Sequence, residues 1–182
     1  MEARFMMRGI TLYEPYASLI SIGAKTNETR PRRTNYRGDI CIHAALKTVD
    51  GIEPEVLDAF RNRAEPMVWK FGCIVAVVDL WDVQPSKHFK SQGTMVWTGD
   101  IEISAEELSF GNYASGRWIY RTRNLRRLTT PIPCKGFQCV GWTVPPEIEA
   151  QVRAQLENQD EDSSKKESYE AELAWTKKIW KS

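Results

Sequence analysis

Apolar and polar residues alternate over several short stretches of the chain, which is typical of β-strands. Residues 39–44 (DICIHA) and 117–122 (RWIYRT) alternate clearly, so we expect two strands that each bury one face. Residues 10–13 and 138–144 predict two further strands. Residues 73–80 are almost continuously apolar, which predicts a strand buried on both faces.

Three stretches between these strands have helical signals. Pro15 can occupy the first turn of a helix, where its missing N–H costs nothing, and Gly23 is well placed to end that helix. Residues 53–63 carry an apolar stripe behind an early proline, which predicts a second helix. Ser104 and Glu107 have the spacing of a capping box, which predicts a third, short helix.

The end of the chain has a different pattern. Pro145 and Pro146 stop the preceding strand and start a helix whose apolar stripe continues to Leu156. Residues 157–168 are polar and predict a linker or solvated loop. Residues 169–182 return to a helical pattern, and this segment could pack on its own domain or on a partner protein.

This mixture of short strands and inserted helices favours an α+β domain with a small curved or closed sheet. It does not favour a doubly wound parallel sheet, because regular strand–helix alternation and a glycine-rich phosphate loop are both missing. With 182 residues, we expect one domain over residues 1–156, a linker over 157–168 and a C-terminal helix over 169–182.

Composition limits the expected location of the protein and its cofactors. The chain has no apolar run near the ~20 residues that a membrane helix needs, and its first residues lack the features of a signal peptide, so we expect a cytoplasmic protein without a membrane partner. Its four cysteines fit that compartment as free thiols. Their spacing matches no common zinc motif and the chain has only two histidines, so we expect no cofactor or bound metal.

The formal net charge is only +1, but the charges are unevenly distributed. Two stretches, 29–38 and 108–146, contain no acidic residue. Their basic residues are Arg30, Arg32, Arg33, Arg37, Arg117, Arg121, Arg123, Arg126, Arg127 and Lys135. If the two stretches meet in the fold, they form a basic face suited to phosphate binding; otherwise they are two separate solvated patches.

Four ordered blocks make the sequence resemble a known family. Gly23, Lys25, Glu28 and Arg30 have the spacing Gly-x-Lys-x-x-Glu-x-Arg, directly after the Pro-aromatic-Ala sequence of residues 15–17. The other three blocks are residues 37–44, residues 72–80, and residues 131–136 together with Gln138, Gly141 and Trp142. Together they resemble the ASCH domain over roughly residues 9–145.

This resemblance implies a PUA-like fold, a small mixed β-barrel with covering helices, to which this chain adds a C-terminal helical extension. It also implies recognition of RNA or nucleotides, with the signature residues beside a cleft between barrel and helix. Members of the family include nucleic-acid binders, nucleases and small amidohydrolases that remove the acetyl group from N4-acetylcytidine.

The signature residues have two interpretations. In the functional one, Lys25 and Arg30 hold a phosphate or a base edge, while Glu28 accepts a hydrogen bond from an exocyclic amine. In the structural one, Glu28 pairs with one of the two cations and pins its strand to the sheet.

Further candidates for ligand binding come from the charge and aromatic patterns. A tryptophan beside arginines could stack on a base, although aromatic residues on alternating strands also pack in cores. His43, on the polar face of its strand, could contact phosphate or serve only as a hydrogen-bonded structural residue. The candidates beyond the signature are Tyr16, Arg37, His43, Arg117, Trp118 and Arg121.

Enzymatic activity is an alternative. Lys25 matches the lysine of the amidohydrolase members, but the position of their threonine nucleophile is Glu28 here, which could act only as a general base for water. A nuclease would need a divalent metal, for which Asp79 and Asp82 are weak candidates.

The sequence therefore favours a protein that binds RNA or single-stranded nucleic acid through a Lys-Glu-Arg cleft and a basic rim. The alternatives are an enzyme, with Lys25 and Glu28 as catalytic residues, and an interaction module that binds a protein through residues 169–182. The partner is expected to be RNA, DNA or a nucleoside-like small molecule.

Overall fold

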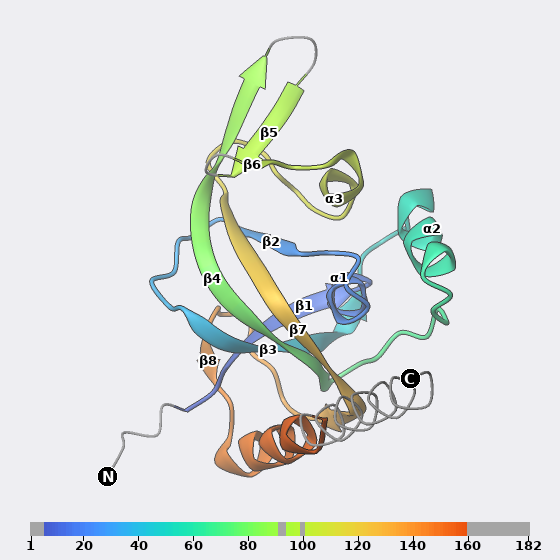
Figure 1. Ribbon diagram of the computed structural model, residues 1–182, viewed down its shortest axis with the longest axis vertical. Coiled ribbons are helices and arrows are strands. Elements are labelled where there is room, and N and C mark those ends of the chain that lie inside the picture. The colour runs from blue at the N-terminus through green and yellow to red at the C-terminus, as the bar shows by residue number, and fades with distance from the viewer. Residues whose placement is uncertain (1–5, 91–93, 99–100, 160–182) are drawn as a thin grey trace, which may run out of the picture.

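The computed structural model describes residues 6–90, 94–98 and 101–159. These residues form a mixed α+β structure, which confirms the predicted class (Figure 1). A further helix occupies residues 146–159. The other elements are β1 (Arg8–Glu14), α1 (Tyr16–Ser21), β2 (Asn27–Arg30), β3 (Gly38–Thr48), α2 (Pro54–Asn62), β4 (Cys73–Lys90), β5 (Thr94–Thr98), β6 (Ile101–Glu102), α3 (Ala105–Ser109), β7 (Trp118–Pro133) and β8 (Trp142–Thr143).

The strands form one strongly curved sheet in the order β2-β7-β4-β3-β1-β8, with β5 paired to β4 and β6 paired to β5. β1 and β3 are parallel, and the other neighbours are antiparallel. β4 and β7 are the long strands that cross the molecule, and the β4–β5 hairpin projects at the end opposite the 146–159 helix (Figure 1).

The expected closed barrel is not confirmed. Pairing of the described strands leaves β2 and β8 as the two edges of an open sheet. β2 has four residues and ends before Pro31, which has no N–H to donate, while β8 has only two residues. The PUA-like barrel therefore stays a prediction from the family resemblance.

Two clusters of apolar side chains cover the two faces of the sheet. On one face, Ala17 and Ile20 of α1 pack against Ile40, Ile42 and other sheet residues. On the other face, Val152 and Leu156 of the 146–159 helix pack against Cys41 and Val77. The apolar run at the start of β4 is buried on both faces, as predicted, because the sheet is covered on both.

This double cover corrects one expectation. Residues 39–44 were expected to bury one face only, yet Ile40 to Ala45 are all buried. Cys41 and His43 lie on the face that would have been solvated, but the 146–159 helix and Trp142 cover it. An alternating pattern in one strand cannot show that a distant helix will pack on its polar side.

Two boundaries also differ from the expected ones. The strand expected over 138–144 is confined to Trp142–Thr143, because Gly141 takes a φ of 72°, which is incompatible with extended backbone. Residues 157–159, expected to begin a linker, continue the 146–159 helix. The remainder of that linker and the expected helix over 169–182 lie outside the described residues.

The described helices include none that is both long and apolar enough to span a membrane.

Candidate functional site

A cleft of about 240 Å³ opens where β2, the start of α1 and the segment after α3 meet. Four of the expected site residues line it, namely Tyr16, Glu28, Arg30 and Arg117. The rest of its wall comes from Thr11, Leu12, Tyr13, Thr29, Pro31, Phe110, Gly111, Asn112 and Gln138. The cleft is therefore built from five separate parts of the chain.

Local structure explains why the signature forms one wall of this cleft. Gly23 adopts a φ of 72° and follows the last residues of α1, so the helix ends there and the chain turns into β2. β2 then pairs with β7, which places Glu28 opposite Tyr120 and Arg30 opposite Trp118.

Glu28 and Arg30 form an ion pair at the cleft wall. Arg30 Nε lies 3.0 Å from Glu28 Oε1, and both side chains are largely buried. Arg30 Nη2 also donates a 2.7 Å hydrogen bond to the carbonyl oxygen of Thr11 on β1. These contacts fix the carboxylate of Glu28 at the cleft, where it can accept hydrogen bonds from a ligand.

Lys25 lies beneath the cleft and does not line it. Its side chain is only 1% exposed, and its Nζ lies 3.9 Å from Glu28 Oε2 and 3.8 Å from Glu107 Oε1. The rings of Tyr16 and Tyr113 each lie 5.8 Å from this Nζ. The ammonium group is thus balanced by two carboxylates and two ring faces, but it has no hydrogen-bond partner in the described part of the chain.

Glu107 is a residue that the sequence did not reveal as part of this site. Its carboxylate accepts hydrogen bonds from the backbone N–H groups of Thr26 and Asn27, at 2.8 and 3.1 Å, and from the Tyr113 hydroxyl at 2.8 Å. Burial and the neighbouring Glu107 raise the pKa of Tyr113 far above its ordinary value, so this hydroxyl keeps its proton. Glu107 therefore ties α3 to the start of β2, directly below Glu28.

The capping-box pattern explains why Glu107 was missed. Ser104 does cap α3, since its hydroxyl accepts a hydrogen bond from the Glu107 N–H at 3.2 Å. In a full capping box the Glu107 side chain would return to Ser104. Here it turns instead to β2, whose N–H groups a sequence pattern cannot place beside it.

Tyr16 and Arg117 complete the polar chemistry of the cleft. Burial, and then the charges of Glu28 and Glu53, raise the pKa of Tyr16, so its hydroxyl stays neutral and can donate or accept. Arg117 donates to the carbonyl oxygen of Thr29 at 2.9 Å. No carboxylate among the described residues forms an ion pair with Arg117, and its buried Nε has no hydrogen-bond partner there.

Four other candidates lie elsewhere. Arg37 is exposed and donates to the carbonyl oxygens of Thr34 and Tyr36, outside the cleft lining. Trp118 is half-buried against the core, with the Arg33 guanidinium 5.7 Å from its ring. Arg121 pairs with Asp82 at 3.2 Å.

His43, the fourth of these candidates, is buried on β3 and does not line the cleft. Its Nε2 lies 2.9 Å from the carbonyl oxygen of Cys134, and its ring meets Trp142 edge to face. Gly136 packs so closely that a Cβ there would lie 2.3 Å from His43 Nδ1. Burial lowers the pKa of His43, which favours a neutral ring that pins the 134–136 segment.

The arginines of β7 do not form the free basic rim that the acid-free stretch suggested. Each of four pairs with a carboxylate from another part of the chain, because β7 lies against acidic residues of β3, β4 and the segment after α2. The pairs are Arg121–Asp82, Arg123–Asp79, Arg126–Asp39 and Arg127–Glu65. These pairings also occupy both aspartates considered as metal ligands. No group of three potential metal-binding side chains is found within the described ranges.

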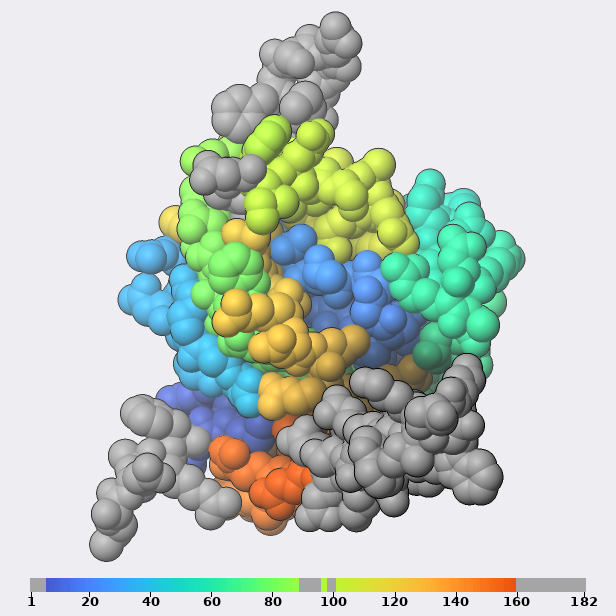
Figure 2. All heavy atoms as spheres, in the orientation of Figure 1, coloured from blue at the N-terminus to red at the C-terminus, as the bar shows by residue number. Residues whose placement is uncertain are grey.

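A second hollow, of about 440 Å³, lies on the other side of β2. Its lining includes Gly23, Ala24, Thr26 and Asn27, most of the 101–107 segment, and Trp81 and Arg121. The Arg121 guanidinium lies 4.1 Å from the centre of the Trp81 ring. Figure 2 shows the blue N-terminal residues set back between the yellow-green segment and the gold strand β7. Of the signature residues, Gly23 lines this hollow, whereas Lys25, Glu28 and Arg30 do not.

Comparison with known proteins identifies the family. The family model for the ASCH domain matches residues 10–178, which is nearly the whole chain. The match extends beyond the region of resemblance seen in the sequence and takes in the tail after residue 157. No curated protein matches the chain. The signature that forms the cleft wall and the extent of this match lead to one conclusion, that the chain belongs to the ASCH domain family.

Proposed function

We propose that this protein binds single-stranded nucleic acid, RNA foremost, and holds the base of one nucleotide in the cleft lined by Tyr16, Glu28, Arg30 and Arg117. The observation that carries the proposal is the composition of that cleft. It combines a fixed carboxylate, a guanidinium without an ion-pair partner and aromatic rings in a space of about 240 Å³. Pockets for drug-sized ligands start at roughly 300 Å³, so this volume favours a single flat ring.

Glu28 is the group that would read the base. A carboxylate accepts hydrogen bonds only, so it favours a base that presents an exocyclic amine, such as cytosine or adenine, over one that presents a carbonyl. Arg30, which pairs with Glu28, and the nearby Lys25 balance the negative charge of Glu28 when no ligand is bound.

Tyr13, Tyr16 and Arg117 would hold the nucleotide in other ways. Tyr13 is 41% exposed and lines the cleft together with Tyr16, so a ring is available for stacking, which is worth ~1–3 kcal/mol per base. The unpaired guanidinium of Arg117 can donate to a phosphate or to a base carbonyl. Membership in the ASCH family, which is associated with RNA binding, supports the same interpretation.

Binding is favoured over turnover because of Lys25. A catalytic lysine must reach the substrate, whereas this side chain is 1% exposed and lies below Glu28. The hydroxyl that the amidohydrolase members carry three residues after the lysine is also absent, since that residue is Glu28. A cytoplasmic location and a protein partner for residues 169–182 stay predictions.

The test is fluorescence anisotropy of labelled single-stranded RNA, single-stranded DNA and duplex DNA. We expect single-stranded RNA to bind and Glu28→Gln to weaken it about tenfold or more, because the amide lacks the charge of the carboxylate and a hydrogen bond to a charged group is worth ~1.5–3 kcal/mol. Glu106→Gln is the matched control, since Glu106 is an exposed carboxylate that pairs with Arg63 outside the cleft.

Circular dichroism would verify that both variants keep the fold, and electrophoresis would verify that the RNA stays intact. Wild-type affinity in the Glu28→Gln variant would contradict the assignment of the base to this cleft. Binding of none of the three nucleic acids would contradict the proposed function itself.

A further inference from the structure

A third hollow, of about 520 Å³, adjoins the cleft. It is lined by residues 30–34, Tyr120 and residues 138–140. Three of its lining residues are arginines, namely Arg30, Arg32 and Arg33, and no acidic residue lines it. We call it the arginine hollow.

The arginine hollow is continuous with the cleft. Arg30, Pro31 and Gln138 line both spaces, so a ligand whose base lies in the cleft can extend past Pro31 without leaving the protein surface. The second hollow, beside Trp81, shares no lining residue with either of them.

The cations of the arginine hollow differ from those of β7. Arg32 and Arg33 are exposed, and neither forms an ion pair with any other described residue. Four arginines of β7, in contrast, are each paired with a carboxylate. A phosphate near β7 would have to displace a carboxylate, whereas Arg32 and Arg33 can bind one without that competition.

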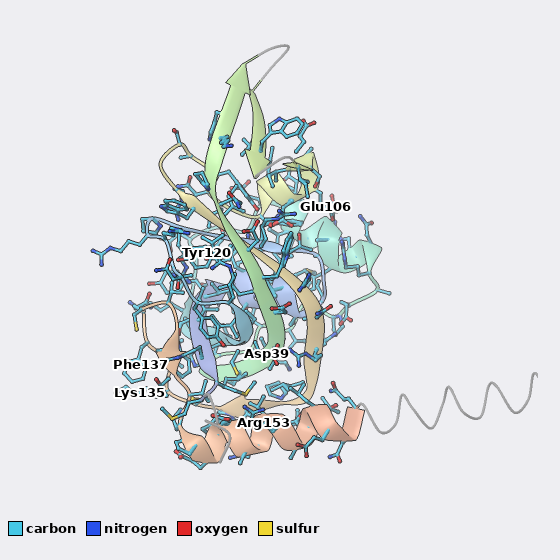
Figure 3. The ribbon with its side chains drawn as sticks, turned by 60° about the vertical axis from the view of Figure 1, so that its left-hand side comes forward. Asp39, Glu106, Tyr120, Lys135, Phe137 and Arg153 are labelled. Carbon is cyan, nitrogen blue, oxygen red and sulfur yellow. The ribbon has the colours of Figure 1, made fainter. Side chains whose placement is uncertain are left out.

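The backbone of residues 30–34 is held in place before any ligand binds. The Tyr120 hydroxyl donates a 2.6 Å hydrogen bond to the carbonyl oxygen of Arg32, and Figure 3 shows Tyr120 on β7 in the middle of the molecule. Arg30 is fixed by pairing with β7 and by its bond to Thr11. The Arg33 guanidinium lies 5.7 Å from the Trp118 ring. Less ordering is therefore needed on binding than for a free loop.

We propose that the arginine hollow holds the phosphodiester backbone that continues from the nucleotide in the cleft, through Arg32 and Arg33. The proposal rests on the proposed function and makes it narrower in two ways. The ligand is a nucleotide chain and not a nucleoside, and the paired arginines of β7 do not contribute to holding it.

The experiment measures the salt dependence of binding to a short labelled single-stranded RNA. Each phosphate contact contributes about −0.7 to the slope of log affinity against log salt for a single strand. We therefore expect the double variant Arg32→Ala, Arg33→Ala to bind at least tenfold more weakly at low salt and to reduce the magnitude of that slope by about 1.4. The matched control is Arg123→Ala, Arg126→Ala, which removes the same charge from paired positions and should leave the slope unchanged.

A competition experiment distinguishes binding of a nucleotide chain from binding of a free nucleoside. In the wild type, we expect unlabelled cytidine and adenosine to compete far less well than the same nucleosides joined in a short RNA. In the Arg32→Ala, Arg33→Ala variant, we expect this difference between nucleosides and RNA to be lost. If that variant keeps the wild-type slope, or if the β7 variant loses as much, the phosphate path is wrong while the cleft assignment stands. If wild-type protein binds no RNA, the proposed function and this inference both fail.

Discussion

At the scale of single residues, the main feature of the site is a buried cation. Lys25 sits between Glu28 and Glu107 with 1% of its side chain exposed. Its charge acts inside the protein, holding two carboxylates that point in different directions, one to the cleft and one to β2. We therefore assign Lys25 a positioning role.

This role predicts a large effect of Lys25→Met on stability. Removal of one partner from a buried ionic group leaves uncompensated charge, which costs roughly 3–5 kcal/mol in the free energy of unfolding. Urea denaturation followed by circular dichroism would measure it, with exposed Lys135→Met as control, expected within about 0.5 kcal/mol of wild type. A loss below about 1 kcal/mol would contradict the balanced-charge account of Lys25.

Glu14 gives a second test at this scale. It is fully buried, where its carboxylate accepts hydrogen bonds from the Ser18 N–H, the Ser18 hydroxyl and the Lys70 N–H. Burial raises the pKa of Glu14 above 4.5, and the hydrogen bonds offset only part of that effect. A raised pKa of an acid in the folded state means that stability is greatest at low pH and is lost as pH rises through the folded pKa.

Comparison with Glu14→Gln isolates this contribution, because glutamine cannot ionise. Urea unfolding at a series of pH values should show the stability of wild type, relative to the variant, falling as the pH rises above 4.5. A difference that does not change with pH, or a relative gain by wild type, would show that Glu14 is not held in its protonated form by burial.

At this scale the sequence predicted which residues lie together, but it did not predict how deeply each of them is buried. The spacing of Glu28 and Arg30 on one strand predicted that they would act together, and they are in contact. The same spacing gave Lys25 an equal part in binding, although the residue lies below the cleft. Depth depends on α3 and Tyr113 packing over β2, which no local pattern in residues 23–30 contains.

At the scale of elements, β2 is a short edge strand that two anchors hold in place. It pairs with β7 along one side, and its start is tied to α3 by Glu107. The second anchor matters because a strand of four residues has few ladder hydrogen bonds of its own. The orientation of Glu28 in the cleft depends on both.

Glu107→Ala tests the second anchor. The variant leaves the N–H groups of Thr26 and Asn27 without their acceptor, so we expect faster amide exchange at these two positions and weaker RNA binding. Hydrogen exchange followed by NMR would measure the rates. Glu106→Ala, on the same helix but paired only with half-buried Arg63, should leave them unchanged; equal rates in both variants would contradict the anchoring role.

The helices and strands could largely be predicted from the sequence, but the elements that pack over them could not. α2 and the 146–159 helix formed where their apolar stripes indicated, with Val56, Phe60 and Val152 buried. The strand over 39–44 also formed, yet its polar face is buried under the 146–159 helix and Trp142. Apolar periodicity predicts one element at a time, whereas burial of Cys41 depends on a helix more than a hundred residues later and burial of His43 on Gly136 and Trp142.

At the scale of the whole molecule, the arrangement of charge separates two groups of arginines. The charge pattern along the chain left open whether residues 29–38 and 108–146 form one basic face or two separate patches. In the fold, carboxylates from β3, β4 and the segment after α2 pair with the four arginines of β7, while Arg32, Arg33 and Arg117 have no ion-pair partner among the described residues. Each of these three arginines lines the cleft or the arginine hollow, where it can bind a phosphate without displacing a carboxylate.

Location of the ligand is the central claim, and an amide NMR titration tests it most directly. Isotope-labelled protein would be titrated with a short single-stranded RNA, and the shift of each assigned amide would be followed. We expect the largest shifts in residues 11–16, 28–34 and 110–112, which border the cleft and the arginine hollow. Shifts concentrated on the outer face of β7 or on the 146–159 helix, with those residues unchanged, would contradict the account.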